Sequence, residues 1–174
     1  MTIFLTGYRC TGKTSIGKTL ANKLKLPFID ADLLLVEEYG VTISEMVAKE
    51  GWQPFREKES HILTKICKMG DQIVATGGGV ILDKKNVSLM KKSGTTVWLT
   101  AKPETIKKRI VQDEKTADSR PSLTSKGLLE EIEDTLSERN PLYEDAMDFS
   151  VETDEKQIEE ICEIIVDRLK AEGI

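Results

Sequence analysis

A segment near the start of the chain has the composition of a loop that binds phosphate groups. Residues Gly7 to Thr14 read G-x-x-x-x-G-K-T, and they follow a short apolar run and precede an amphipathic stretch. Glycine at both ends permits backbone angles that a β-carbon would penalise, so successive N–H groups can turn inward around a phosphate chain. Lys13 can place its ammonium between two phosphates, and the Thr14 hydroxyl suits Mg²⁺. The sequence therefore predicts an ATP site, whose loop residues are Cys10, Thr11, Gly12, Lys13, Thr14 and Ser15.

Two aspartates separated by one residue, Asp30 and Asp32, follow the next apolar run along the chain. Residues that follow the strands of a parallel sheet lie at its carboxyl edge, where α/β proteins bind their ligands. Carboxylates at positions i and i+2 can diverge, so that Asp30 reaches Mg²⁺ directly or through water while Asp32 faces an acceptor hydroxyl. Taken alone, the pair is equally well explained as a helix cap.

A run of three glycines, Gly77 to Gly79, follows the third apolar run. Consecutive glycines cost backbone entropy and add no packing, so we expect another group to approach this backbone closely. A flexible exit from the strand is the alternative.

Three arginines lie beside prolines that mark a turn or a helix boundary: Arg56 with Pro54, Arg120 with Pro121, and Arg139 with Pro141. A surface arginine is usually solvated, and that is the alternative for each one by itself. Together with a phosphate loop, they indicate guanidinium groups that bind carboxylate and phosphate oxygens.

The order of apolar and helical segments predicts the fold that positions these residues. Short β-type runs alternate with longer helical stretches, and no hairpin turn joins neighbouring runs, which predicts an α/β fold with a parallel sheet covered on both faces. The expected strands are Ile3–Thr6, Pro27–Ile29, Ile73–Thr76, Thr96–Leu99 and Phe149–Val151. The chain length fits one domain of residues 1–174.

Three helices have clear signals in the sequence. The first should begin around Gly12, and Thr42 with Glu45 has the spacing of a capping box that starts another. The last helix carries an apolar stripe that we expect to face the core, formed by Ile158, Ile161, Cys162, Ile165 and Leu169.

The polar stretch at about 112–126 interrupts the helical pattern and contains Arg120 followed by Pro121. Beside a nucleotide site, we expect such a stretch to form a mobile lid. A surface loop without a function is the alternative.

Charge and composition exclude several classes of protein. The formal net charge of −5 and the isoelectric point near 5.1 argue against a nucleic-acid partner. The three cysteines form no C-x-x-C pair, no basic leader precedes the first apolar run, and the apolar runs are too short to cross a bilayer. We therefore expect a cytoplasmic protein with reduced thiols and no membrane partner.

Taken together, the motifs resemble those of the shikimate kinases, within the nucleoside-monophosphate-kinase-like group of P-loop proteins. G-x-x-x-x-G-K-T, D-x-D, G-W-x-x-F-R-x-x-E, T-G-G-G, R-P and R-x-P-L-Y occur in the family's order and at its approximate spacings, over nearly the whole chain. The resemblance implies a three-layer P-loop fold whose five parallel strands have the order 2-3-1-4-5. It also implies a substrate-binding helical region at about 31–65 and a closing lid at about 112–126.

The resemblance further implies a role for each site residue. The shikimate-binding residues would be Asp32, Arg56, Gly77, Gly78, Gly79 and Arg139. The residues that join the phosphate loop in binding ATP would be Arg109 and Arg120. The magnesium ligands would be Thr14 and Asp30. The catalytic residues would be Lys13, Asp32 and Arg120. Of these residues, Arg56 and Arg139 would hold the shikimate carboxylate, and Glu59 would steady Arg56.

Such an enzyme would move the γ-phosphoryl group of ATP directly onto the 3-hydroxyl of shikimate, a step in chorismate and aromatic amino-acid biosynthesis. Asp32 would orient the acceptor hydroxyl and accept its proton, and the protein would act as a monomer. Two alternatives stay open: a related small-metabolite kinase such as a gluconate kinase, and a nucleotide-binding module without catalysis.

Overall fold

The centre of the protein is a sheet of five parallel strands. The computed structural model describes residues 1–112, 127–171 and 173. Its strands are β1 (Thr2–Thr6), β2 (Phe28–Asp30), β3 (Ile73–Ala75), β4 (Gly94–Thr100) and β5 (Phe149–Glu152). They lie in the order β2-β3-β1-β4-β5, and each neighbouring pair is parallel. The five strands and their order were predicted correctly.

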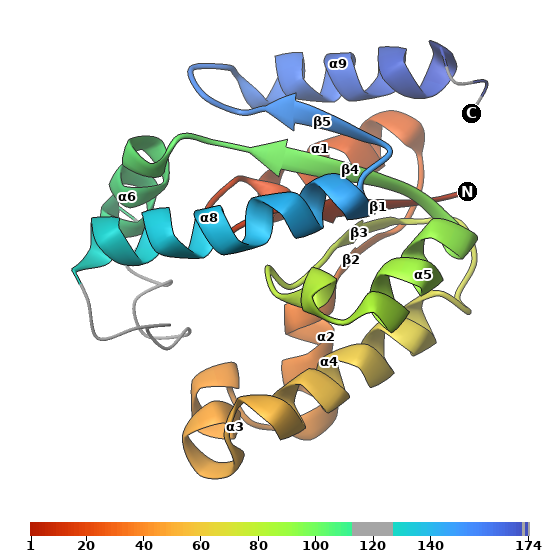
Figure 1. The fold of residues 1–174 in the computed structure, drawn as a ribbon. Coiled ribbons are helices and arrows are strands. Elements are labelled where there is room, and N and C mark those ends of the chain that lie inside the picture. Colours follow the sequence, from red (N-terminus) through yellow and green to blue (C-terminus); the bar gives the residue numbers. More distant parts are fainter. Residues whose placement is uncertain (113–126, 172, 174) are drawn as a thin grey trace.

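Helices connect the strands and cover both faces of the sheet (Figure 1). Those in the described part of the chain are α1 (Lys13–Leu24), α2 (Ala31–Tyr39), α3 (Ile43–Glu50), α4 (Trp52–Ile66), α5 (Lys84–Ser93), α6 (Pro103–Gln112), α8 (Leu128–Ala146) and α9 (Ile158–Ala171), with a short 3₁₀ helix, η1 (Val80–Leu82). None of these helices is long and apolar enough to cross a membrane.

Alternate residues of β1 pack into two separate hydrophobic layers, because successive side chains of a strand point to opposite faces. Ile3 and Leu5 lie in a layer with residues of α1 and α9, including Leu20 and Ile165. Phe4 lies in the other layer, which is built from residues of α2, α3, α4, α5 and α8. The sheet is therefore buried on both sides, as its continuous apolar strands predict.

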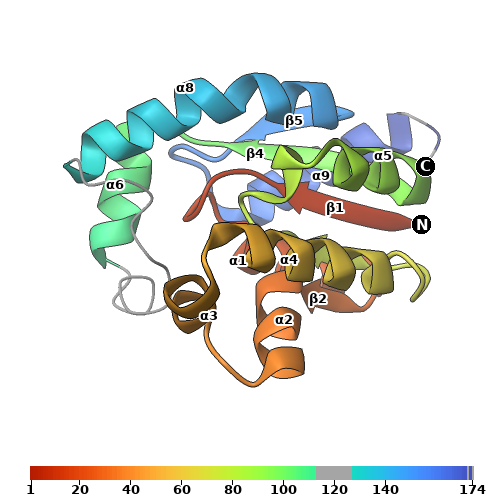
Figure 2. The ribbon, with the colours of Figure 1, turned by 60° about the horizontal axis from the view of Figure 1, so that its bottom comes forward.

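The helices α2, α3 and α4 form a group at the β2 side of the sheet (Figure 2). Helix α3 begins with the predicted capping box: the Glu45 N–H donates to Thr42 Oγ1, and the Thr42 N–H donates to a carboxylate oxygen of Glu45 at 2.8 Å. This reciprocal pair fixes the start of α3 and, through it, one wall of the site described below.

Two further helix predictions had different outcomes. The first helix begins at Lys13 with Gly12 as its N-cap, as predicted. The expectation that Arg139 and Pro141 mark a helix boundary was wrong, because both lie inside α8. Proline has no backbone N–H, so Pro141 removes one hydrogen bond from the helix. The packing of α8 against the sheet and α6 maintains the helix through that position.

Candidate active site

The loop between β1 and α1 has the backbone shape that the glycine pattern predicts. Gly7, Cys10 and Gly12 have positive φ angles of 137°, 60° and 96°. A β-carbon on Gly7 would lie 2.4 Å from the carbonyl oxygen of Leu99, so only glycine fits there. Cys10 is not a glycine, and the left-handed conformation costs an L-residue about 1–2 kcal/mol. The loop therefore stores backbone strain at Cys10.

Lys13 is the first residue of α1, and its side chain folds back over this loop. Its Nζ donates to the carbonyl oxygens of Gly7 and Tyr8, each at 2.8 Å, and only 7% of the residue is exposed. The ammonium and the amino end of α1 bring positive charge to the same place. Such an end of a helix is a site for anions, and above all for phosphates.

Asp30 and Thr14 meet at the carboxyl edge of the sheet. The Thr14 hydroxyl donates to Asp30 Oδ2 at 2.7 Å, while Asp30 Oδ1 accepts from the N–H groups of Asp32 and Leu33 and so caps α2. The cap and the proposed metal ligand are therefore the same residue. Hydroxyl and carboxylate oxygens suit Mg²⁺, which usually keeps several waters and phosphate oxygens as its other ligands. Because the described residues contain no cluster of three or more His, Cys, Asp or Glu side chains, a metal held here would need such ligands.

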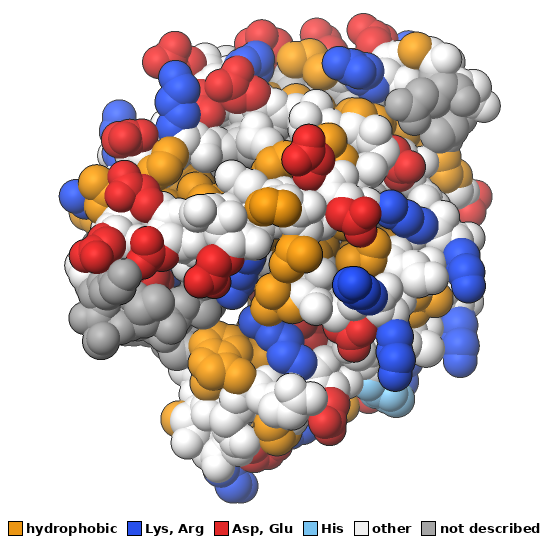
Figure 3. All heavy atoms as spheres, viewed as in Figure 1, with side chains coloured by type: hydrophobic (Ala, Val, Ile, Leu, Met, Phe, Trp, Pro, Cys, Tyr) orange, Lys and Arg blue, Asp and Glu red, His pale blue; other side chains and the backbone are white. Residues whose placement is uncertain are grey.

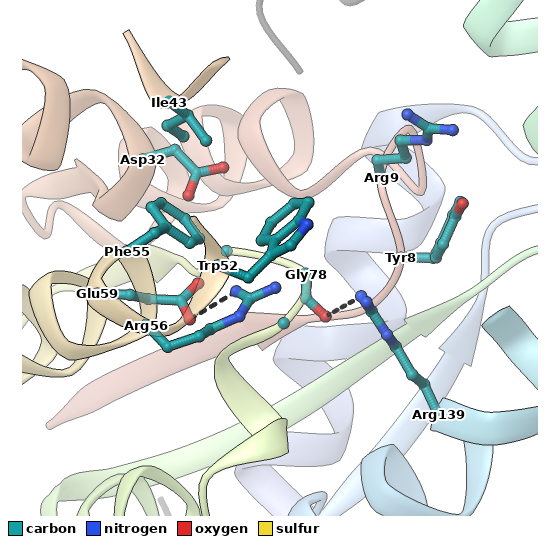
Figure 4. Close-up of a pocket in the computed structure, with 12 residues that line it drawn as sticks. Tyr8, Arg9, Asp32, Ile43, Trp52, Phe55, Arg56, Glu59, Gly78 and Arg139 are labelled. Atoms are coloured by element: carbon teal, nitrogen blue, oxygen red, sulfur yellow. Dashed lines mark hydrogen bonds and ion pairs between the residues drawn. The ribbon is translucent and has the colours of Figure 1, made fainter. Parts of the chain in front are cut away.

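A pocket lies between the loop, α2, α4 and α8, close to the ends of β1 and β3 (Figure 4). Its lining residues are Tyr8, Arg9, Asp32, Ile43, Trp52, Phe55, Arg56, Glu59, Gly77, Gly78, Gly79 and Arg139. All the residues that the sequence assigns to acceptor binding therefore line one pocket. Asp32 faces it from the first turn of α2, whereas the Asp30–Thr14 pair is not among the residues that line this pocket.

Arg56 is held in place from several directions. Its Nη1 lies 2.8 Å from Glu59 Oε2, one turn further along α4, and its guanidinium lies 5.2 Å from the centre of the Trp52 ring and 5.0 Å from that of Phe55. Burial raises the pKa of Glu59 against the opposing effect of the Arg56 charge. The other oxygen of Glu59 has no hydrogen-bond partner among the described residues.

Glycines follow β3 because neighbouring side chains lie too close to this backbone to leave room for a β-carbon. A β-carbon on Gly79 would lie 2.3 Å from the guanidinium nitrogens of Arg56, and one on Gly77 would lie 2.3 Å from Glu59 Oε1. The middle glycine, Gly78, presents its carbonyl oxygen to α8 and accepts a hydrogen bond from Arg139 Nη1. The expectation of a close approach to this backbone is confirmed by these contacts.

A second cleft, of about 360 Å³, lies on the other side of the loop. It is lined by Cys10, Thr11, Gly12 and Ser15 with residues of α6 and α9 and the segment after β5. Arg109 of α6 borders it and donates to the carbonyl oxygens of Cys10 and Thr153, at 3.2 and 2.7 Å. These contacts place Arg109 beside the loop and away from the acceptor pocket.

A groove of about 750 Å³ opens next to the acceptor pocket, between α4, α5 and α8. Arg56, Glu59 and Arg139 border both spaces. In the space-filling view, Lys and Arg side chains lie in and beside the hollow between α8 and α4 (Figure 3). The groove gives a charged molecule a route from solvent to the two arginines.

The lid predicted at about 112–126 and its Arg120 lie outside the described residues, apart from Gln112, which ends α6. Several residues of the site carried no assignment from the sequence. Arg9, a residue of the loop, lines the pocket, and the Tyr143 hydroxyl donates to the carbonyl oxygen of Gly78 in the glycine run. Trp52 and Tyr143 are letters of the motifs G-W-x-x-F-R-x-x-E and R-x-P-L-Y, and that was the signal that could have found them.

Comparisons with known proteins agree with this geometry. A family model described as shikimate kinase matches residues 9–170. The shikimate kinase of Rhodopirellula baltica is 37% identical over 159 residues, which are 91% of this chain and 85% of that protein. Shikimate kinase 2 of Sodalis glossinidius is 43% identical over 144 residues, or 83% and 82% of the two chains. A solved structure of shikimate kinase from Acinetobacter baumannii in complex with shikimate superposes with a TM-score of 0.93 at 28% identity, covering 99% of this chain and 94% of that one.

Proposed function

Because this chain belongs to the shikimate kinase family, we propose that it transfers the γ-phosphoryl group of ATP to the 3-hydroxyl of shikimate. The observation that carries this proposal is a single pocket beside the phosphate loop in which Asp32 lies with Arg56 and Arg139. An acceptor that has both a hydroxyl and a carboxylate matches these three groups. Aspartate accepts a hydrogen bond from a hydroxyl, and guanidinium groups bind carboxylates through paired hydrogen bonds.

Arg56 and Arg139 bind the acceptor carboxylate from two sides of the glycine run. Glu59 and two aromatic rings restrain Arg56, so little rotamer freedom is left for it to lose when the carboxylate binds. Arg139 comes from α8, across Gly78 from Arg56 (Figure 4). The Gly77–Gly79 backbone closes the pocket between them.

Transfer needs alignment of the two substrates and neutralisation of the phosphate charge. The acceptor oxygen forms a bond to the γ-phosphorus, its proton passes to the Asp32 carboxylate, and ADP leaves with the electron pair of the broken P–O bond. Lys13 exchanges a contact with a loop carbonyl for one with a phosphate oxygen. Arg109 supports the side of the loop that faces the second cleft, where the nucleotide would bind.

Thr14 and Asp30 are the residues that would hold Mg²⁺, and their hydroxyl and carboxylate oxygens fit that ion. When bound, Mg²⁺ neutralises charge that develops on the phosphate oxygens. Contact of Arg120 with the same phosphates stays a prediction from the sequence, as do the single domain, the monomeric state and the cytoplasmic location.

A coupled assay of ADP release, run with ATP and Mg²⁺ in the presence and absence of shikimate, tests the proposed function. We expect ADP release that depends on shikimate and a product whose phosphorus signal in NMR couples to the proton at carbon 3. Gluconate serves as the second acceptor, because a kinase for that substrate is the nearest rival. ADP release with gluconate but not with shikimate would reject the proposal in favour of that rival, and no turnover with either acceptor would favour a module that only binds nucleotide.

A further inference from the structure

One carbonyl oxygen in the acceptor pocket receives hydrogen bonds from two side chains of the same helix. The oxygen of Gly78 accepts from the Tyr143 hydroxyl at 2.5 Å and from Arg139 Nη1 at 3.3 Å. Arg139 and Tyr143 are four residues apart in α8, so they lie one above the other on one face of the helix. The Tyr143 hydroxyl and the Arg139 guanidinium differ in how firmly their surroundings hold them.

Tyr143 is fixed by its surroundings. The residue is fully buried, and its ring stacks on Trp98 of β4 with the ring centres 5.6 Å apart and the planes 16° from parallel. Burial raises its pKa well above the ordinary value of a tyrosine, so the hydroxyl keeps its proton and remains a donor. The hydrogen bond from this buried, stacked tyrosine holds the Gly78 carbonyl in one direction.

Arg139 makes the longer of the two bonds, and its distance of 3.3 Å is beyond the usual range for an N–H···O bond. To bind a carboxylate with both arms of its planar fork, the guanidinium must turn away from the Gly78 oxygen. If Arg139 were the sole donor, that turn would leave a partly buried carbonyl without a hydrogen bond, at a cost in binding. Because Tyr143 stays on the oxygen, Arg139 can leave it without depriving the carbonyl of its hydrogen bond.

The same bond also sets the direction of a backbone donor. In a planar trans peptide, the carbonyl of one residue and the N–H of the next point in opposite directions. The Gly78 oxygen points toward α8 and Arg139 (Figure 4), so the N–H of Gly79 points away from α8. Gly79 lines the pocket on the side where Arg56 lies, so the hydroxyl of Tyr143 fixes the backbone that the acceptor meets.

We propose that Tyr143 is a positioning residue for the acceptor carboxylate: its hydroxyl holds the Gly78 carbonyl and thereby releases Arg139 to bind the substrate. This assignment rests on the proposed function, since it concerns how the same pocket recognises shikimate. Tyr143 touches neither substrate in this role and acts through Gly78 and Arg139.

The test compares shikimate with its methyl ester in the wild type and in Tyr143→Phe. Phenylalanine keeps the ring against Trp98 and removes only the oxygen, and thermal unfolding checks that the variant is folded. We expect KM for shikimate to rise about ten-fold, the effect of losing one hydrogen bond, while kcat stays within about three-fold and KM for ATP is unchanged. The methyl ester already lacks the charged interaction with Arg139. Its kcat/KM should therefore differ by less than about two-fold between the wild type and Tyr143→Phe.

Tyr39→Phe is the matched control, because it removes a tyrosine hydroxyl from α2 outside the acceptor pocket. In an Arg139→Ala background, Tyr143→Phe should cause a smaller further loss of shikimate affinity, measured by calorimetry, than it causes in the wild type, because only its effect on the Gly79 backbone remains. Equal losses for the acid and the ester would show a purely structural role and overturn the proposal while leaving the proposed function standing. Unchanged shikimate affinity in Tyr143→Phe would overturn it as well, and absence of shikimate turnover in the wild type would overturn both.

Discussion

Arg9 of the phosphate loop and Glu131 of α8 form an ion pair in which Arg9 Nη2 lies 2.6 Å from Glu131 Oε1. The side chains are only 12% and 3% exposed. In Figure 4 the Arg9 guanidinium points away from Arg56 and Arg139, so it does not compete with them for the acceptor. The pair connects the predicted phosphate loop to α8, the helix that carries Arg139.

Replacing Glu131 by Gln should lower the free energy of unfolding by about 3 kcal/mol, because it leaves the Arg9 charge largely out of water without its counter-charge. Urea denaturation followed by circular dichroism measures the loss. Glu133→Gln, on the exposed side of the same helix, is the control and should change stability by less than about 0.5 kcal/mol. Equal stabilities of the two variants would show that the pair contributes nothing.

Replacing Asp32 by Asn should lower kcat by a factor of about 10² to 10⁴, since the amide cannot accept the proton of the acceptor hydroxyl. KM for ATP should stay close to that of the wild type, because the nearby Asp30–Thr14 contact is untouched. Steady-state kinetics with both substrates varied give the two constants, with Asp145→Asn on the exposed surface of α8 as control. If the variant loses ATP affinity and keeps its kcat, then Asp32 belongs to the nucleotide site.

The stability of the protein should depend on pH through Glu59. Its pKa in the folded protein is raised above the ordinary value of 4.5 by burial, with the neighbouring Asp32 acting in the same direction. A raised pKa means that the folded protein binds the proton more tightly, so the contribution of Glu59 is fully present below pH 4.5 and is lost as the pH rises through the folded value. The unfolding free energy of the wild type minus that of Glu59→Gln should therefore fall as the pH rises above 4.5.

Denaturant titrations at several pH values measure that difference, and Glu57→Gln is the control because Glu57 is exposed on the same helix. The Glu57 variant gives the baseline against which the pH dependence measured for Glu59→Gln is compared. A difference for Glu59→Gln that grows with pH would mean that the attraction of Arg56 outweighs burial.

Alkylation by iodoacetamide near pH 7.5 should modify Cys10 before the other thiols. Burial raises the pKa of Cys67, and that of Cys162 to about 11, so both stay protonated, and the thiolate is the reactive form. Cys10 lines the cleft in which we propose that the nucleotide binds, so ATP should slow its labelling and labelling should abolish ATP binding. Mass spectrometry identifies the labelled peptide, and Cys10→Gly, which suits the positive φ of that position, should keep activity and resist inactivation. Equal rates of Cys10 labelling with and without ATP would show that ATP does not bind beside Cys10.

The sequence predicted the elements because their signals are local. The apolar runs identified all five strands, and the Thr42–Glu45 spacing placed the start of α3. The order of the strands could not be predicted from the apolar runs, because these runs do not show which strands are neighbours. The prediction of the order came from the resemblance to a family. Proline at position 141 was misread because a local rule for helix ends was applied where packing holds the helix together.

The contacts that complete the site were not predictable in the same way. Arg9 and Glu131 are 122 positions apart, and Gly78 and Tyr143 are 65 apart. No local pattern encodes which side chains meet across such distances, since the meeting depends on how α8 packs over the sheet. The divergence of Asp30 and Asp32 was predicted, because it follows from the geometry of one turn after a strand.

Helix α8 carries Glu131, Arg139 and Tyr143, so its geometry constrains how the gene for this protein can change in length. One inserted or deleted codon between the first and last of these residues would turn the rest of the helix by about 100° and shift it by about 1.5 Å. The ion pair to the phosphate loop and the contacts to Gly78 could then not form together. Substitutions can accumulate along this stretch, but we expect insertions and deletions to survive only in the segments outside it, and alignments of descendants of this gene should be free of gaps between these positions.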